Sequence, residues 1–318
     1  MNQRFLSNYY RIIGSAILLS AGGCAKPMLS LSDVVVVNGG QTAIDALSEH
    51  SSPLGDVDQL TGVNVEFFAG DQTLGTARTD QGGWARWRCH LPDGASSVRA
   101  RAVVDGQTVE AEGGVFAWDP KRTIIVCDID ETVSATSYTA LLAKGEDDLG
   151  SQPLPGAVKA MTDLSKRFNL IYITGRPRFL LNKSRRWLKT NGFPAAPVVT
   201  APTLKEAIRV QKFKGGQIAD LQCLSSNLLI GIGNAMTDSE AYAANGLVTL
   251  IIDEGDSNRF RSHAIVVRDW EMIGRFFEAN REVLEDPARL SSLIQREGML
   301  YRPVRRYMPC HLHASPNC

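Results

Sequence analysis

The 318-residue sequence has little that would place it in a specialised class of protein. It carries 34 basic and 34 acidic residues, so its formal net charge is zero and we expect no nucleic-acid partner. Six cysteines at irregular spacings are too few for a disulfide scaffold. A hydrophobic fraction of 44% is ordinary for a globular protein, and the length allows two domains.

The N-terminal apolar run, residues 12–19, is too short to span a bilayer as a helix. Arg4 and Arg11 precede it, and small residues follow it up to Cys24, an order typical of a secretory signal. Residues 1–23 therefore resemble a bacterial lipoprotein signal, which would make Cys24 the lipid-bearing first residue. We expect an exported protein of the cell envelope, anchored to a membrane through Cys24 and facing the periplasm or the cell surface. Plain secretion and an uncleaved anchor are the alternatives.

The remaining cysteines indicate no metal site. Cys127 and Cys223 adjoin apolar runs and are predicted to be buried thiols. Cys310 and Cys318 are the nearest pair for a disulfide in an exported protein, and the tail around them is predicted to be disordered or disulfide-tied. It offers no second ligand pair at zinc spacing.

Residues 24–118 have the pattern of a β protein. Residues 24–60 are predicted to be a linker with one strand, at Val34–Val37. Residues 61–118 contain short alternating runs separated by turn dipeptides, which favour a small β-sandwich. This segment resembles immunoglobulin-like surface modules and is expected to be a spacer or a binding platform.

Residues 119–285 have a different pattern, which predicts an α/β domain with a parallel sheet covered by helices on both faces. Helical segments are expected at 156–168, 179–190 and 270–284. A C-terminal helix and tail follow over 286–318. Near-continuous apolar runs, typical of buried strands, lie at 123–127, 170–173, 198–200, 228–232, 248–252 and 264–267.

In such sheets ligands bind beyond the carboxyl ends of the strands, so the residues there are candidates for a site. Asp128 and Asp130 follow the first run. One carboxylate can attack phosphorus, while the other protonates the leaving oxygen and later activates water. Both would repel a phosphate dianion, so a divalent cation is needed, and Mg²⁺ suits carboxylate ligands.

The later strand ends provide the remaining groups. Thr174, Gly175 and Arg176 place a hydroxyl and backbone N–H groups where a phosphoryl oxygen would lie. Asn234 and Asp238 offer an amide oxygen and a carboxylate to the metal. The ammonium that would neutralise the phosphate comes from one of three lysines: Lys205, Lys212 or Lys214.

Taken together and in this order, the motifs Asp128–Thr132, Tyr172–Arg176, Lys212–Lys214 and Gly233–Tyr242 resemble those of the haloacid dehalogenase superfamily. Within it they are closest to the lipin-type phosphatidate phosphatases, and the preceding β-module is similar to the arrangement in the actin-patch type. The resemblance covers about half of the chain. It implies a Rossmann-like parallel sheet and an aspartyl-phosphate intermediate.

The resemblance also implies a role for each residue. Asp128 would be the nucleophile, Asp130 the acid and base, and Thr132 the residue that orients their loop. Thr174, Gly175, Arg176 and Lys214 would hold the phosphoryl group. Mg²⁺ would be held by Asp128, Asp130 through its backbone carbonyl, Asn234 and Asp238.

Three functions remain open at this stage. The first is a phosphatase of lipid phosphates such as phosphatidate. The second is a phosphatase of soluble phosphomonoesters such as nucleotides, and the third is a non-catalytic lipid-sensing module. The segment between Thr132 and Gly156 is short enough to form only a flap, which favours an open site and a large substrate.

Basic residues between Arg176 and Lys189 are the last feature of interest. They are expected on a helix, either as a solvated face or as a surface for anionic lipid. The residues are Arg176, Arg178, Lys183, Arg185, Arg186 and Lys189.

Overall fold

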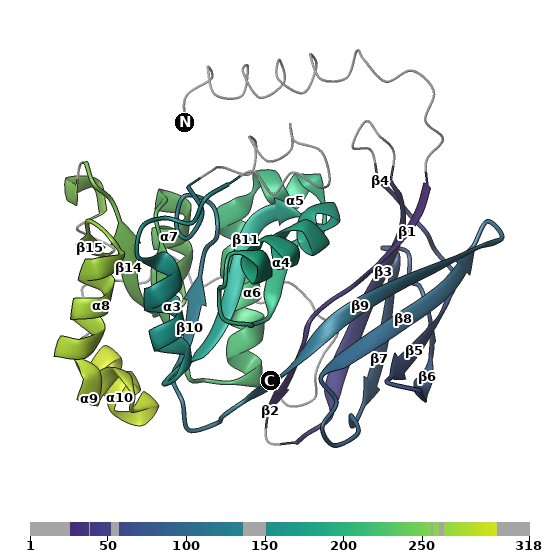
Figure 1. The fold of residues 1–318 in the computed structure, drawn as a ribbon, viewed down its shortest axis with the longest axis horizontal. Coiled ribbons are helices and arrows are strands. Elements are labelled where there is room, and N and C mark those ends of the chain that lie inside the picture. The colour runs from purple at the N-terminus through teal and green to yellow at the C-terminus, as the bar shows by residue number, and fades with distance from the viewer. Residues whose placement is uncertain are drawn as a thin grey trace, which may run out of the picture. The chain divides into compact units, whose positions relative to one another are not determined.

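The computed structural model describes residues 26–37, 39–51, 57–135, 151–255, 257–260 and 264–297. The predicted signal with Cys24, most of the segment that follows Thr132 and the tail with Cys310 lie outside these residues. The described residues form two compact units, a β-module up to residue 114 and an α/β unit from residue 115 onward, which also includes residues 35–40 (Figure 1).

The β-module contains two antiparallel sheets. In the first, β3 (Thr42–Ser51) pairs with β1 (Lys26–Leu31), β4 (Val57–Gln59) and β7 (Trp84–Cys89). The second has the order β2-β9-β8-β5-β6. Its strands are β2 (Val34–Val37), β5 (Asn64–Ala69), β6 (Gln72–Arg78), β8 (Ser97–Val104) and β9 (Gln107–Trp118).

The two sheets pack on each other as the sandwich that the sequence predicts. β1 lies against β8, and β7 lies against β5 and β6. Along β8 every second residue is buried, from Val98 to Val104, while the arginines between them are exposed. This alternation buries one face of the sheet and leaves the other to solvent.

The structure differs from the prediction over residues 24–60. Apart from Val34–Val37, the described part of this segment also forms β1, β3 and β4 rather than a linker. β3 reads Thr-Ala-Ile-Asp-Ala-Leu-Ser-Glu-His-Ser, with few of the β-branched and aromatic residues that mark strands. Its pairing with β1, β4 and β7 makes it a strand.

The α/β unit is built on one six-stranded sheet in which every pair is parallel. The strand order is β12-β11-β10-β13-β14-β15. All six predicted strands are present, which confirms the expected sheet. They are β10 (Ile124–Cys127), β11 (Asn169–Pro177), β12 (Val198–Ala201), β13 (Leu228–Gly233), β14 (Val248–Ile252) and β15 (Ile265–Val267).

Helices cover both faces of this sheet. Ile125 and Cys127 of β10 pack with α3, α4, α8, α9 and α10, whereas Ile124 and Val126 pack with α5, α6 and α7. Alternate residues of one strand thus support two cores. The helices are α3 (Ala157–Ser165), η2 (Arg178–Leu180), α4 (Leu181–Thr190), α5 (Leu204–Ile208), α6 (Val210–Leu224), α7 (Met236–Ala244), η3 (Ser257–Phe260), α8 (Trp270–Ala279), α9 (Arg281–Leu284) and α10 (Pro287–Glu297).

The cysteine prediction is correct for one residue and wrong for the other. Cys127 is buried in the sheet, where burial raises the pKa of its thiol well above the usual value. Cys223 is exposed, because it lies near the C-terminal end of α6 on the side away from the sheet. Apolar neighbours in sequence indicate burial only when they share a face of the helix.

No helix in the described part of the chain is both long enough and apolar enough to cross a bilayer.

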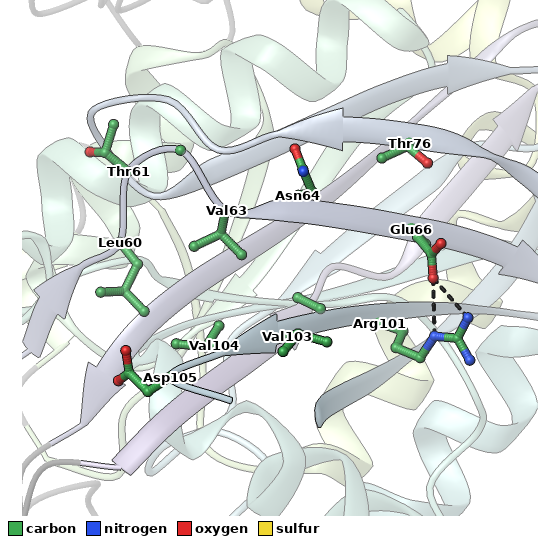
Figure 2. Close-up of a pocket in the computed structure, with 12 residues that line it drawn as sticks. Leu60, Thr61, Val63, Asn64, Glu66, Thr76, Arg101, Val103, Val104 and Asp105 are labelled. Carbon is green, nitrogen blue, oxygen red and sulfur yellow. Dashed lines mark hydrogen bonds and ion pairs between the residues drawn. The ribbon is translucent and has the colours of Figure 1, made fainter. Parts of the chain in front are cut away.

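A shallow groove of about 750 Å³ lies on the β-module (Figure 2). Arg101 donates to Glu66 at one end through Nε and a terminal nitrogen, at 3.1 and 2.8 Å, and Leu60 and Asp105 lie at the other end. Among the charged side chains that line it, Arg101 and Glu66 are paired with each other and Asp105 is paired with His50. The groove thus offers no chemistry comparable to that of the sheet in the α/β unit.

Gly231→Ala is expected to destabilise the α/β unit by about 1–3 kcal/mol, because overpacking displaces well-packed neighbours. A Cβ at Gly231 of β13 would lie 2.4 Å from the ring of Tyr242, which fixes α7 on the sheet. Gly274→Ala in α8 is the control, since a Cβ there meets nothing within 4 Å and alanine favours the helix. Urea unfolding of both variants measures the difference, and equal stability would contradict this packing.

Candidate active site

The predicted site residues meet at the carboxyl ends of the central strands. Asp128 follows β10, and its backbone N–H donates to the carbonyl oxygen of Ile232 in β13 at 2.9 Å. Thr174 and Arg176 are at the end of β11, and Asn234 follows β13. Adjacent parallel strands thus bring together residues that are about a hundred positions apart in the sequence.

A buried lysine joins two of the carboxylates. Lys214 Nζ donates to Asp128 Oδ1 and to Asp238 Oδ1, both at 2.5 Å. These three residues are at most 4% exposed. Lys205 and Lys212, the other candidates for the phosphate-neutralising lysine, have exposed side chains. Of the three lysines, Lys214 is the one that lies in the site.

Asp238 is held by the start of its own helix. Its Oδ2 accepts from the backbone N–H groups of Asn234 and Ala235, at 3.2 and 3.1 Å. Such a carboxylate in the first helical turn satisfies N–H groups that have no partner within the helix. Both oxygens of Asp238 are therefore engaged, one by Lys214 and one by the backbone.

Thr132 links Asp128 to Asn234. Its hydroxyl lies 3.3 Å from Asp128 Oδ2 and 3.1 Å from Asn234 Oδ1. The amide nitrogen of Asn234 donates to Glu131 at 3.4 Å, which turns the amide oxygen toward Thr132. Trp270 of α8 donates to the carbonyl oxygen of Thr132 at 2.7 Å and so holds the loop from the other side.

Asp130 makes a separate set of contacts. Arg176 approaches it with Nε, 3.1 and 3.0 Å from its two oxygens, and with a terminal nitrogen at 2.9 Å. Thr174 donates to Asp130 Oδ2 at 2.9 Å. The other terminal nitrogen of Arg176 donates to Ser184 of α4 at 3.0 Å. Asp130 is thus held by a planar, two-point contact of the kind that fixes geometry.

The pairing of β11 with β12 shifts in register between Thr174 and Pro177. Such irregularities re-aim side chains and are frequent beside active sites. Gly175 and Arg176 lie within it. Arg176 is 1% exposed and therefore faces Asp130 and Ser184 rather than solvent.

The prediction of a basic helical surface after Arg176 is wrong for half of its residues. Arg176 belongs to β11, while Arg178 and Lys183 are buried. Arg186 and Lys189 of α4 are exposed and Arg185 is half-buried, so the charge at the surface is about half of that expected. Trp187 and Leu188 are buried in the core beneath α4, and Lys183 lies on this same buried face of the helix.

The charges of the site do not balance. When all five groups are ionised, Asp128, Asp130 and Asp238 are opposed by Lys214 and Arg176, which leaves one negative charge. Burial raises the pKa of Asp128 to about 7, Lys214 opposes the rise, and Asp238 and Asp130 add to it. Burial alone would lower the pKa of Lys214, yet Asp128 and Asp238 raise it. The excess negative charge is the environment that a cation would stabilise.

Oxygen donors suited to Mg²⁺ lie on the Thr132 side of this cluster. They are Asp128 Oδ2 and Asn234 Oδ1, next to the loop that carries the Asp130 carbonyl. Among the described residues no three Asp, Glu, His or Cys side chains gather as a metal cluster. The candidate ligands here include an amide and a backbone carbonyl, and both are common ligands of hard cations.

Two supporting residues could not be inferred from the sequence. Ser184 carries the hydrogen bond that anchors Arg176, and Trp270 holds the Thr132 carbonyl from a helix more than a hundred residues away. Neither stands in a motif. Only the packing of α4 and α8 on one face of the sheet brings them to the site.

Asp128→Asn is expected to stabilise the protein in EDTA above about pH 7. The Asp128 pKa is about 7 in the folded protein, against about 3.9 in the unfolded chain. The folded state thus keeps a proton that the unfolded state has lost, and the contribution of Asp128 to the unfolding free energy falls as pH rises through this window. We expect the variant to be more stable by about 1–3 kcal/mol near pH 8. Parallel stability curves of parent and variant from pH 5 to 8 would contradict the assignment.

Residues 125–252 match the family model described as the LNS2 domain of PITM 1-3, which is less than half of the chain. No curated protein sequence matches the chain. Among solved structures, a hydrolase of the haloacid dehalogenase-like family, SP0104 from Streptococcus pneumoniae, is 14% identical over 50% of this chain and 100% of its own, with a TM-score of 0.34. The M1 domain from titin is 14% identical over 30% of this chain and 95% of its own, with a TM-score of 0.22.

The match to LNS2 covers β10 to β14, the strands that carry Asp128, Thr174 and Asn234. The chain combines an N-terminal β-domain with a parallel-sheet α/β domain, and it is within the α/β domain that the LNS2 model matches.

Proposed function

We propose that this chain is a Mg²⁺-dependent phosphatase that hydrolyses phosphate monoesters, with a lipid phosphate such as phosphatidate as its substrate at the cell envelope. The observation that carries the proposal is the placement of Asp128 and Asp130 at one strand end, each with its own cationic partner. Lys214 contacts the first and Arg176 the second. Two carboxylates in unlike environments suit two different roles in one reaction.

In the first half-reaction a carboxylate oxygen of Asp128 attacks phosphorus. The new O–P bond forms as the P–O bond of the ester breaks, and Asp130 donates its proton to the departing oxygen. Lys214 and the backbone N–H groups after Thr174 neutralise charge on the phosphoryl oxygens. The product of this step is an alcohol and an aspartyl-phosphate on Asp128.

In the second half-reaction Asp130 accepts a proton from water, whose oxygen then attacks phosphorus. The bond between phosphorus and Asp128 breaks, which restores the carboxylate and releases inorganic phosphate. Asp130 ends protonated and ready for the next ester. The Arg176 and Thr174 contacts hold its carboxyl group at the end of β11, and they have to loosen for the proton transfers.

Mg²⁺ fits the oxygen donors of the site. Asp128 Oδ2, Asn234 Oδ1 and the Asp130 carbonyl would hold it, and Asp238 would assist by fixing Lys214 and the Asn234 backbone. Bound there, the ion would offset the excess negative charge and polarise a phosphoryl oxygen. This agrees with the general use of Mg²⁺ by haloacid dehalogenase-like folds.

A lipid substrate is supported by the LNS2 match and by the predicted lipid anchor at Cys24. Soluble phosphomonoesters remain the alternative substrate class, since the residues that contact the phosphoryl group would be the same. Membrane attachment through Cys24, a periplasmic or surface location and a membrane partner are part of the same proposal.

A non-catalytic lipid-sensing module is the second candidate, and one observation favours it. Both oxygens of Asp130 are occupied by Arg176 and Thr174. If these contacts never loosen, Asp130 cannot reach a leaving oxygen and the site would bind a phosphate without cleaving it. The two candidates therefore differ in whether Asp130 can be released.

Phosphate release is the direct test of the proposal. The purified chain should release phosphate from phosphatidate vesicles with Mg²⁺ and not with EDTA, while soluble nucleotides and sugar phosphates are hydrolysed more slowly. Asp128→Asn should lower turnover by about 10⁴-fold or more, because it removes the nucleophile and keeps the shape. Binding of phosphatidate without turnover in the parent would instead support the sensing module.

The role of Asp130 can be separated from that of Arg176 by the leaving group. Asp130→Asn should cost about 10²–10⁴-fold on an alkyl phosphate and much less on p-nitrophenyl phosphate, whose leaving group needs no proton. Arg176→Lys keeps the charge but loses the two-point contact, so it should show the same pattern with a smaller loss of roughly tenfold. If Arg176 instead binds the substrate phosphate, both esters lose activity equally and KM rises for both.

A further inference from the structure

Few large apolar side chains are strongly exposed in the described residues, and two of them lie on one short helix. Leu204 and Ile208, the first and last residues of α5, are 37% and 54% exposed. They are four residues apart and so lie on the same side of the helix. Ala207, also in α5, is buried against the sheet, which fixes the apolar pair outward.

This helix lies at the same edge of the sheet as the catalytic carboxylates. α5 packs against β11 and β12, after the carboxyl end of β12. The next helix, α6, begins at Val210, whose side chain lies close to Gly175. A Cβ added to Gly175 would be 2.8 Å from a methyl carbon of Val210. Lys214, one turn further along α6, enters the site itself.

Basic side chains surround the apolar pair. Lys205, Arg209 and Lys212 are exposed. The one acidic residue among positions 204–212, Glu206, is half-buried and accepts a hydrogen bond from Thr203 at 3.1 Å. Three positive charges against one negative leave a net charge of +2 on this stretch, although the whole chain is neutral.

We propose that these five residues, Leu204, Lys205, Ile208, Arg209 and Lys212, form a surface that docks on an anionic lipid bilayer. We call it the α5 surface. An apolar pair that enters the boundary of the acyl chains, flanked by cations that meet the headgroups, is the composition of an interfacial helix. The choice of a bilayer rests on the proposed function, because docking there places the phosphoryl-binding strand ends at the membrane.

The α5 surface differs from the basic residues of α4, which the sequence suggests as a lipid-binding face. α4 packs on the opposite face of the sheet from α5 and α6. Of the large apolar residues on α4, Leu181, Trp187 and Leu188 are all buried. Charge without exposed apolar side chains gives weaker, salt-sensitive attachment.

Vesicle co-sedimentation tests the proposal with the full chain carrying Cys24→Ser, so that no predicted acyl anchor contributes. Vesicles of phosphatidylcholine with phosphatidylglycerol are compared with phosphatidylcholine alone. Replacing both Leu204 and Ile208 with serine should weaken binding to anionic vesicles about tenfold, since each side chain is only partly available for burial. Replacing Lys205 and Arg209 with glutamine should weaken the same binding by about tenfold or more and leave the neutral vesicles unaffected.

Leu224→Ser is the matched control. Leu224 is 59% exposed and lies at the other end of α6, about 20 Å away along a helix that rises 1.5 Å per residue. It should bind vesicles as the parent does. A second control reverses Arg185 and Arg186 of α4 to glutamate, which should have a smaller effect than the glutamine pair.

Three outcomes would overturn the inference: the serine pair binds as the parent does, Leu224→Ser loses as much binding, or the parent binds no vesicle. If the variant with both serines still binds vesicles but no longer binds a soluble protein that the parent binds, the α5 surface is a protein-binding site. Hydrolysis of p-nitrophenyl phosphate by every variant distinguishes these failures from failure of the proposed phosphatase. That activity needs no membrane and should change little, because none of the substituted residues contacts Asp128 or Asp130.

Discussion

The candidate site depends on one buried lysine shared between two carboxylates. Lys214 comes from α6, Asp128 from the end of β10 and Asp238 from the start of α7, so a single ammonium holds three elements at the same point. Removing Lys214 would leave two buried carboxylates without their shared cation, which is among the more costly defects in a protein core. Because Asp238 is also bonded to the backbone before α7, the lysine is fixed in place before any ligand arrives. The arrangement still has more negative than positive charge, which favours a divalent cation and would repel a phosphate dianion until that cation is bound.

The second carboxylate belongs to a different network. Asp130 is held by Arg176 and Thr174 from β11, and Arg176 is held in turn by Ser184 of α4. The two aspartates stand two residues apart, yet they share no cation, so the protonation and position of each can be set separately. This separation is the physical requirement for one group to act as a nucleophile and the other as an acid and base. For the same reason, the two proposed functions differ in whether Arg176 can release Asp130: a phosphatase requires that release, and a lipid-sensing module does not.

The sequence predicted the parts of the fold that depend on short, local patterns of apolar residues. Six apolar runs became six parallel strands, and the residues after three of those strands meet in one site. β3 was missed because its residues have low strand propensity, and its pairing with β1, β4 and β7 is seen only in the structure. Cys223 was misplaced because apolar neighbours do not reveal the orientation of a helix. Arg176 was expected to meet phosphate or solvent, and its contact with Asp130 follows from an irregularity of β11 that no local motif encodes. The supports from Ser184 and Trp270 depend on how helices pack, so they too required the structure.

One helix connects the chemistry to the proposed membrane contact. α6 starts beside Gly175, carries Lys214 into the site on its buried side and follows directly after the exposed residues of α5. Docking of the α5 surface on a bilayer would therefore take place next to α6, the helix that positions Lys214 between Asp128 and Asp238. Docking on anionic lipid would also concentrate the site where a lipid phosphate is found, a gain that requires no additional contact with the substrate. The apolar pair lies at the same carboxyl-end edge of the sheet as the site, which is consistent with a headgroup as substrate. A nucleotide or sugar phosphate, which diffuses freely, would gain nothing from it.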